Sequence, residues 1–273
     1  MTNISVVLTS YNEEKNIKDC LRSVEELATE TIVVDGSSTD KTAAIARQLK
    51  AKVFIVSNKI MFHRNKQLAL EKARGDWILQ LDADERVTPK LQEEIQSIIP
   101  ALPAGRHHPS SIINGYYIPR KNYFLGKFLS KGGQYPDYVI RLVRRGKAYF
   151  PCKSVHEQIK VDGSIGYLKN PLIHLSSPTL SGYLKNANRY TTLTAQELMK
   201  NNIPLNFFNQ WNYLFFLPMK TFIKIYFRHK GFLDGFPGFL FALFSGLHYS
   251  IAFLKYWEKK KNKADFNIDN DWN

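Results

Sequence analysis

Cysteine is scarce in this chain, and its first residues lack the marks of a secretory leader. The 273 residues include two cysteines, Cys20 and Cys152, which are far apart and outside any Cys-x-x-Cys spacing. A disulfide framework and a cysteine-based zinc site are therefore not expected. The apolar segment 4–8 is too short for a signal h-region and has no basic n-region before it, so we expect this part of the chain to stay in the cytosol.

Acidic residues are scarce in the second part of the sequence. Residues 1–100 carry 14 Lys and Arg against 15 Asp and Glu, whereas residues 101–273 carry 24 against 9. The whole chain has a formal net charge of +14, and its 44% apolar content excludes global disorder. A basic, aromatic second part suits nucleic acid, anionic lipid or a phosphorylated substrate.

Over the first 100 residues, short apolar segments alternate with segments whose apolar residues have helical spacing. This alternation predicts an α/β fold with a mostly parallel sheet, right-handed crossovers and helices on both faces. The expected strands are residues 4–8, 31–35, 53–56 and 77–81, and the expected helices are about 13–27, 43–49, 63–74 and one that begins at Thr88-Pro89. Polar side chains follow the strand ends, which is the edge where open α/β sheets bind ligands.

Two carboxylates, Asp82 and Asp84, come directly after the fourth expected strand. Their spacing allows both to reach one small site, and hard divalent cations prefer such oxygen ligands. A solvated acidic turn is the simpler interpretation, because Asp-x-Asp is a common sequence. Asp35 ends another strand on the same expected edge, which favours a binding site.

Three linked motifs resemble family 2 glycosyltransferases, namely residues 6–14 (VVLTSYNEE), 32–40 (IVVDGSSTD) and 75–85 (GDWILQLDADE). Later segments, including Val155-His156-Glu157 and Gly231-Phe232-Leu233-Asp234-Gly235, resemble a subgroup that contains β-1,4-glucosyltransferases of the lipopolysaccharide inner core. The resemblance covers nearly the whole chain and implies a Rossmann-like GT-A fold.

The resemblance also implies roles for single residues at the donor site. The implied nucleotide-contacting residues are Thr9, Tyr11 and Glu13 after the first strand, Asp35 at the uracil, Arg64 at the base or diphosphate, and Asp82, with Asp84 as metal ligand. A divalent cation, Mg²⁺ or Mn²⁺, would neutralise the charge that develops on the leaving diphosphate. An exposed arginine on a helix face is the alternative for Arg64.

The general base is assigned to Glu157, because Val155-His156-Glu157 resembles the subgroup's VHE motif and no Glu-Asp or Asp-Asp base motif is evident. An inverting transferase needs one carboxylate to deprotonate the acceptor hydroxyl. A surface glutamate on a loop is the alternative. His174 lies on an apolar stretch and is expected to be a packed histidine rather than a metal ligand. Phosphates of an acceptor would suit the cations of the middle segment, which are Arg120, Lys121, Arg141, Arg144 and Arg145.

We expect two regions. Residues 1–200 form a transferase domain, with a nucleotide-binding half (1–100) and an acceptor half (101–200). Residues 201–273 form an aromatic and basic helical region. Within the latter, the 20 residues from Gly235 to Leu254 contain no Asp, Glu, Lys or Arg, which is the length of a membrane span. Helices lying in the membrane interface are favoured over a span or a packed helix, because Trp, Tyr and Lys flank the stretch.

These features predict an inverting, metal-dependent hexosyltransferase that is peripheral on the inner face of the cell membrane. Its expected partners are a UDP-sugar, a glycolipid or saccharide acceptor of lipopolysaccharide-core type, and an anionic membrane surface, without nucleic acid. The resemblance favours glucose as the sugar, which motif spacing by itself does not specify. The alternatives are a basic nucleic-acid-binding protein, which would lack any recognised nucleic-acid motif and leave the acidic motifs unexplained, and an inactive nucleotide-sugar-binding relative.

Overall fold

The computed structural model describes residues 3–58, 62–99, 113–152 and 158–263. The chain forms two compact units, each made of two chain segments. The first unit comprises Met1–Arg120 and Asp137–His174, and the second comprises Lys121–Pro136 and Leu175–Asn273.

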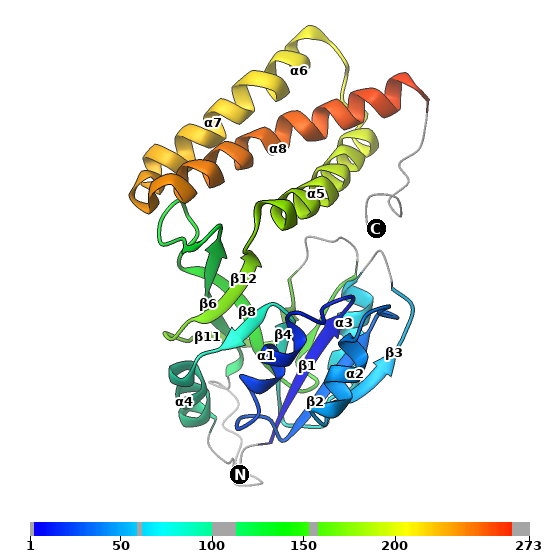
Figure 1. Ribbon diagram of the computed structural model, residues 1–273, viewed down its shortest axis with the longest axis vertical. Coiled ribbons are helices and arrows are strands. Elements are labelled where there is room, and N and C mark those ends of the chain that lie inside the picture. Colours follow the sequence, from blue (N-terminus) through cyan, green and yellow to red (C-terminus); the bar gives the residue numbers. More distant parts are fainter. Residues whose placement is uncertain (1–2, 59–61, 100–112, 153–157, 264–273) are drawn as a thin grey trace. The chain divides into compact units, whose positions relative to one another are not determined.

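Four parallel strands form the centre of the first unit, in the order β3-β2-β1-β4 (Figure 1). They are β1 (Ile4–Ser10), β2 (Glu30–Asp35), β3 (Lys52–Ile55) and β4 (Trp77–Asp82). The strand β1 is apolar on consecutive residues because side chains on both faces of the sheet are buried. Val6 and Leu8 belong to one hydrophobic cluster and Val7 to another.

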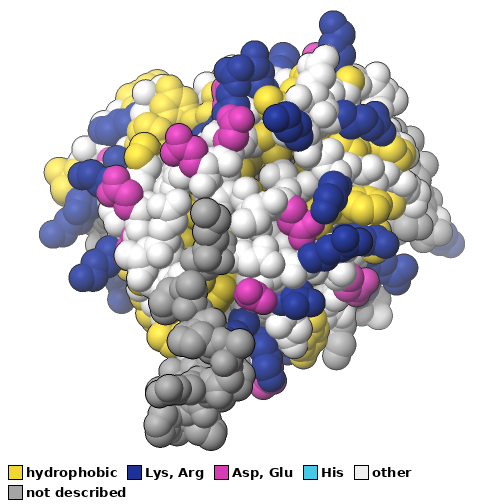
Figure 2. Space-filling view, turned by 90° about the horizontal axis from the view of Figure 1, so that it is seen from below, with side chains coloured by type: hydrophobic (Ala, Val, Ile, Leu, Met, Phe, Trp, Pro, Cys, Tyr) yellow, Lys and Arg dark blue, Asp and Glu magenta, His cyan; other side chains and the backbone are white. Residues whose placement is uncertain are grey.

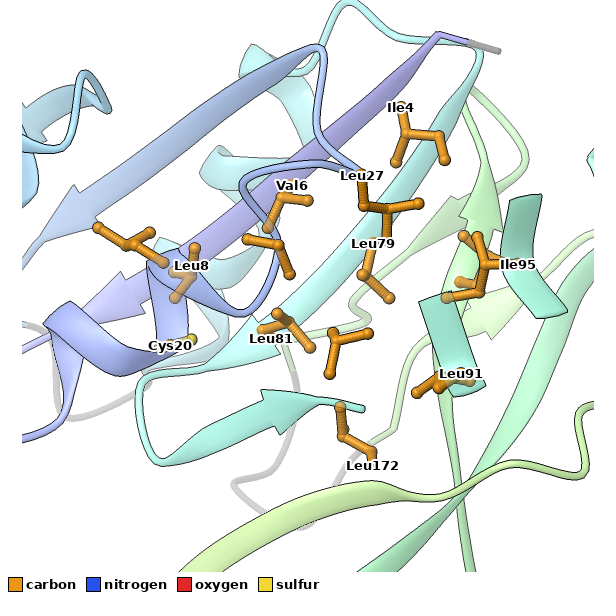
Figure 3. Close-up of a cluster of buried hydrophobic side chains, with 14 of the residues drawn as sticks. Ile4, Val6, Leu8, Cys20, Leu27, Leu79, Leu81, Leu91, Ile95 and Leu172 are labelled. Atoms are coloured by element: carbon orange, nitrogen blue, oxygen red, sulfur yellow. The ribbon is translucent and has the colours of Figure 1, made fainter. Parts of the chain in front are cut away.

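Helices cover both faces of this sheet, as the sequence predicts. They are α1 (Ile17–Arg22), α2 (Thr42–Gln48), α3 (His63–Lys72) and α4 (Pro89–Ile98). Side chains of α1, α2 and α4 pack in the cluster of Val6 and Leu8, whereas Ala69 and Leu70 of α3 pack in the cluster of Val7. Figure 3 shows the first cluster, with side chains of β1, β4, α1 and α4 pointing toward one another.

Mainly antiparallel strands extend the sheet beyond β4, in the order β4-β8-β6-β12-β5. The remaining strands are β5 (Glu85–Val87), β6 (Ile113–Phe124), β7 (Lys127–Phe128), β8 (Asp137–Arg144), β9 (Ala148–Tyr149), β10 (Lys160–Val161), β11 (Ser164–Tyr167) and β12 (Leu172–Ser177). The strands β9 and β10 pair separately. The α/β fold is confirmed: parallel strands lie at the centre of the sheet and helices pack on both of its faces.

The second unit is dominated by helices. They are α5 (Leu180–Lys200), α6 (Phe207–Trp211), the π-helical turn η1 (Asn212–Phe216), α7 (Leu217–Ile223), the π-helical turn η2 (Lys224–Arg228), the 3₁₀ turn η3 (Gly231–Asp234) and α8 (Gly235–Lys261). The helix α8 packs against both α5 and α7 (Figure 1). Ala195 and Leu198 of α5 share a small core with Phe253 and Tyr256 of α8.

Close backbone approach fixes the packing of α7 on α8. A Cβ atom on Gly246 would lie 2.6 Å from the carbonyl oxygen of Pro218, so only glycine fits at this crossing.

The helix α5 belongs to the second compact unit, whereas the division expected from the sequence groups residues 1–200 together. The functional meaning of the sequence division stays a prediction.

One helical segment in the described part of the chain, Gly231–Lys261, is long and apolar enough to cross a membrane. It contains the charge-free stretch that the sequence singles out. Length and composition alone do not distinguish a spanning helix from one packed inside a protein.

Candidate functional site

The register of the parallel strands brings the predicted site residues to one edge of the sheet. Thr9 of β1 pairs with Asp82 of β4, and Ser10 pairs with Asp35 of β2 on the other side. Asp35 and Asp82 therefore flank the end of β1 from its two neighbouring strands. This arrangement places the three expected binding segments at the carboxyl edge, where α/β sheets bind ligands.

The loops that follow β1 and β2 are bonded to each other. Asn12 has a φ of 55°, a left-handed conformation that asparagine adopts more readily than most residues. Its side-chain oxygen accepts a hydrogen bond from the backbone N–H of Thr39 at 2.8 Å. The backbone N–H of Glu13 donates to the hydroxyl of Thr42 at 2.7 Å. Tyr11 precedes these contacts in the chain and is half-buried.

Asp35 is fully buried and orders the second loop. Its carboxylate accepts hydrogen bonds from the backbone N–H of Ser38 at 2.8 Å, from the Ser38 hydroxyl at 2.6 Å and from the Ser10 hydroxyl at 2.9 Å. A carboxylate offers about four acceptor positions, so these three bonds leave roughly one for another donor.

Asp82 is held between two cations. The Nζ atom of Lys66 lies 2.5 Å from one carboxylate oxygen, and a guanidinium nitrogen of Arg141 lies 2.5 Å from the other. Burial by itself would raise the pKa of Asp82, but the charges of Arg141 and Lys66 outweigh burial and hold its pKa well below the usual range. Asp82 is therefore ionised, and its orientation is fixed from two directions.

Arg141 connects Asp82 to a second buried carboxylate. The same guanidinium nitrogen lies 2.7 Å from Glu85, and the guanidinium also donates to the side-chain oxygen of Gln80. Burial opposes the charged form, yet the carboxylates of Asp82 and Glu85 raise the pKa of Arg141 further. Glu85 in turn accepts a 2.9 Å hydrogen bond from the backbone N–H of Asp82, which closes the network.

Two of the cations that were expected to bind acceptor phosphates form ion pairs with carboxylates of the protein instead. Arg141 is buried with Asp82 and Glu85, so it is not the open, acceptor-facing cation that the sequence suggested. Arg120 donates two hydrogen bonds to Asp137, at 2.7 and 3.0 Å, and lies 3.6 Å from Glu85. The physical reason is that buried carboxylates at the strand ends require paired cations.

Asp84 contacts His174, which the sequence treated as a packed histidine. The Nε2 atom of His174 lies 3.3 Å from a carboxylate oxygen of Asp84. Burial would raise the pKa of Asp84, but the hydrogen bond and charge of His174 lower it below the ordinary value. His174 reaches this position because β12 pairs with β5 and His174 lies opposite Glu85.

Glu13 completes the acidic end of the site. Burial raises the pKa of Glu13, and the nearby charges of Asp84 and Asp82 raise it further, although a hydrogen bond from Asn16 opposes the shift. Glu13 therefore lies close enough to Asp82 and Asp84 for their charges to act on its carboxylate.

The described structure brings together most, but not all, of the residues chosen from the sequence. Arg64 lies on the exposed side of α3, whereas Lys66, two residues later on the same helix, reaches Asp82. Lys66 belongs to the same His-Arg-Asn-Lys segment, and only the helix orientation distinguishes the two cations. Glu157 lies outside the described residues, so its assignment as base stays a prediction.

A divalent cation fits one part of this site. Among the described residues no group of three or more His, Cys, Asp and Glu side chains is placed to hold a metal. The Asp84 oxygen and the His174 nitrogen nevertheless provide an adjacent pair of the ligand types that Mn²⁺ accepts. Such a pair would leave further positions for diphosphate and water oxygens. Asp82 has its two oxygens engaged by cations and is less suited to be a ligand.

The chain belongs to glycosyl transferase family 2, because the model of that family matches residues 5–161. This match spans the parallel strands and the strand-end cluster described above, except for His174. It confirms the family resemblance that the three sequence motifs carry.

Similarity to individual proteins extends over most of the chain. The lipopolysaccharide core biosynthesis glycosyltransferase LpsC of Rhizobium meliloti is 28% identical over 97% of this chain and 96% of its own length. An uncharacterised glycosyltransferase of Rickettsia felis is 30% identical over 88% of this chain and 84% of its own length. Among solved structures, S. aureus TarS 1-349 in complex with UDP covers 97% of this chain and 93% of that chain, at 17% identity and a TM-score of 0.47.

Proposed function

We propose that the protein transfers a sugar from a UDP-sugar, with glucose as the favoured sugar, to a glycolipid or saccharide acceptor of lipopolysaccharide-core type. Membership of glycosyl transferase family 2 and similarity to LpsC along nearly the whole chain support this proposal. The observation that carries it is the Asp82–Asp84 turn, whose carboxylates are ionised and fixed at the carboxyl edge of the parallel strands.

In this proposal the donor nucleotide occupies the edge formed by Thr9, Tyr11, Glu13 and Asp35. The remaining acceptor position on Asp35 suits an N–H group of a uracil ring. In this proposal Lys66, rather than Arg64, is the cation of α3 at the donor diphosphate, because it lies beside Asp82.

Asp84 and His174 would hold a divalent cation, which when bound supplies positive charge against the departing diphosphate. Lys66 and Arg141 keep Asp82 ionised and oriented, so that its carboxylate can contact the nucleotide sugar without movement at the time of reaction.

Glu157 is the proposed general base for the acceptor hydroxyl. It would take the hydroxyl proton as the acceptor oxygen attacks the anomeric carbon opposite the leaving diphosphate, which inverts the configuration. Replacing Glu157 by Gln should leave donor binding intact and slow turnover at least about 100-fold. Near-normal turnover of Glu157→Gln would refute the assignment.

The reaction is tested by incubating the protein with Mg²⁺ or Mn²⁺ and a panel of nucleotide sugars, and measuring release of the nucleoside diphosphate. Release that depends on one UDP-sugar and on an acceptor extracted from cell envelopes is the expected result. Binding without release would instead identify an inactive relative. Tight nucleic-acid binding without any effect of nucleotide sugars would identify the alternative function.

We also propose that the protein works as a peripheral protein on the inner face of the cell membrane, where a glycolipid acceptor is presented. The exposed aromatic side chains of the second unit and the basic composition of its helices support this location. Release of the full chain from membranes by carbonate or high salt, without detergent, is the expected result, and extraction by detergent alone would contradict it.

A further inference from the structure

The helical segment from Phe207 to Arg228 exposes large apolar side chains at every fourth residue. Their exposed fractions lie between 48% and 80%. The six residues, here called the outer stripe, are Phe207, Trp211, Phe215, Met219, Ile223 and Phe227. No residue of α6, η1, α7 or η2 is fully buried, so the segment has one packed side and one open side.

Two π-helical turns keep the outer stripe on one side of the segment. In an α-helix of 3.6 residues per turn, each step of four residues overshoots a full turn by about 40°, so five steps would carry the stripe roughly halfway around. The turns η1 and η2 hold more residues per turn and offset this drift. The opposite side faces α8, where Tyr213 stacks on Phe253 at a centroid distance of 5.0 Å and Phe222 contacts Phe239 at 5.7 Å.

A row of cations follows the same spacing beside the outer stripe. Lys220, Lys224 and Arg228 each come one residue after a member of the stripe, and all three are exposed. No Asp or Glu occurs in residues 198–233. This composition differs from the face in Figure 2, where Lys and Arg side chains are interspersed with Asp and Glu.

We propose that the outer stripe is inserted in the interfacial layer of an anionic lipid bilayer, with Lys220, Lys224 and Arg228 at the lipid phosphates. The proposal deepens the peripheral membrane location given above and rests on it. Apolar side chains beside unopposed cations match a surface that is apolar inside and negatively charged outside. A second copy of the same face is disfavoured, because it would bring the two cation rows together without any carboxylate between them.

The proposal assigns lipid contact to α6–η2 rather than to the charge-free part of α8 that the sequence singles out. The helix α8 lies against α5 and α7, and its small residues Gly238, Ala242 and Gly246 are buried. One face of α8 is therefore packed against neighbouring helices, and 28% of its apolar window is buried. The outer stripe has no such cover within the second unit.

Sedimentation of the full chain with vesicles tests the proposal in the absence of nucleotide sugar. Vesicles of phosphatidylcholine are compared with vesicles that also contain phosphatidylglycerol, and the wild type is expected to bind the anionic vesicles more tightly. The triple variant Phe215→Gln, Met219→Gln, Ile223→Gln should lose at least about 100-fold in vesicle affinity, because three inserted apolar side chains become polar. The matched control is Leu247→Gln, Ile251→Gln, Leu254→Gln, which changes three exposed apolar residues of α8 and should bind like the wild type.

The cation row is tested separately. Lys220→Gln, Lys224→Gln, Arg228→Gln should reduce affinity for anionic vesicles by about 100-fold and affinity for neutral vesicles by much less, because each cation interacts with the negative surface. The control Lys18→Gln, Arg22→Gln, Arg47→Gln removes the same charge from exposed positions of the first unit and should have little effect. A blue shift of tryptophan emission on vesicle addition, present in the wild type and reduced in Trp211→Phe, checks insertion without a triple variant.

Three results would overturn the proposal. These are unchanged vesicle binding by the stripe variant, loss of binding by the α8 control, and a concentration-dependent dimer that the stripe variant abolishes in the absence of vesicles. Diphosphate release from the UDP-sugar, measured in parallel, separates this proposal from the proposed function. Vesicle binding without sugar transfer would contradict the transferase proposal, whereas transfer without vesicle binding would contradict the outer stripe.

Discussion

The two units differ in where they place charged and apolar side chains. In the first unit, charged groups such as Asp35, Glu85 and Arg141 are buried and hydrogen-bonded at the strand ends. In the second unit, large apolar side chains are exposed, and most of the exposed large apolar residues of the described chain lie there. A buried ionic network fixes a polar site, whereas an exposed apolar face suits an environment less polar than water.

The largest expected effect comes from breaking the ionic network of the first unit. Arg141→Met leaves the carboxylates of Asp82 and Glu85 buried without their shared cation, and should lower the free energy of unfolding by about 3–5 kcal/mol. Denaturant unfolding followed by circular dichroism measures this change. The control Arg145→Met, at an exposed position, should change it by less than about 0.5 kcal/mol.

A second expected effect separates catalysis from membrane binding. Asp84→Asn removes the charged oxygen that pairs with His174, and should lower the rate of diphosphate release at least about 100-fold. Vesicle affinity should stay within about twofold of wild type, because Asp84 belongs to the first unit. Equal activity of Asp84→Asn and the wild type would exclude Asp84 as metal ligand.

Close helix packing in the second unit should be sensitive to a single methyl group. In Gly246→Ala the new Cβ meets the backbone carbonyl of Pro218, and the strain should cost about 2 kcal/mol of stability despite the better helix propensity of alanine. Leu247→Ala, at the next position but exposed, is the control and should cost less. If the two variants had the same unfolding curve, the close contact between α7 and α8 at Gly246 would be contradicted.

The smallest expected effect concerns a half-buried carboxylate outside the site. Glu30 accepts hydrogen bonds from the Ser5 hydroxyl, the Arg74 backbone N–H and Lys52, which outweigh burial and lower its pKa to about 2. Its contribution to stability is therefore complete above the unfolded-state pKa and is lost as the pH falls toward about 2.

Glu30→Gln should be about 1 kcal/mol less stable than the wild type at neutral pH, and this difference should shrink between about pH 4.5 and pH 2. The exposed Glu25 provides the control, since Glu25→Gln should show no such pH dependence. A stability difference that stays constant down to pH 2 would contradict the assignment.

Much of the first unit could be predicted from local sequence. Continuous apolar runs such as residues 4–8 identify strands buried on both faces, and the carboxylates that follow them are fixed at one edge by parallel pairing. Lys66 could not be separated from Arg64, because a helix of unknown orientation presents either cation to the sheet. The contact of His174 with Asp84 could not be predicted, since it spans 90 positions of the chain and depends on the pairing of β12 with β5.

The amino-acid sequence by itself determined the family, the positions of the parallel strands along the chain and the excess of cations after residue 100. These properties depend on local composition and short motifs. Only the tertiary structure decided that Arg141 is an internal counter-ion of Asp82 and that α6–η2 exposes a large apolar side chain at every fourth residue. The physical reason is that burial and charge pairing depend on which distant segments meet, and no local pattern records that meeting.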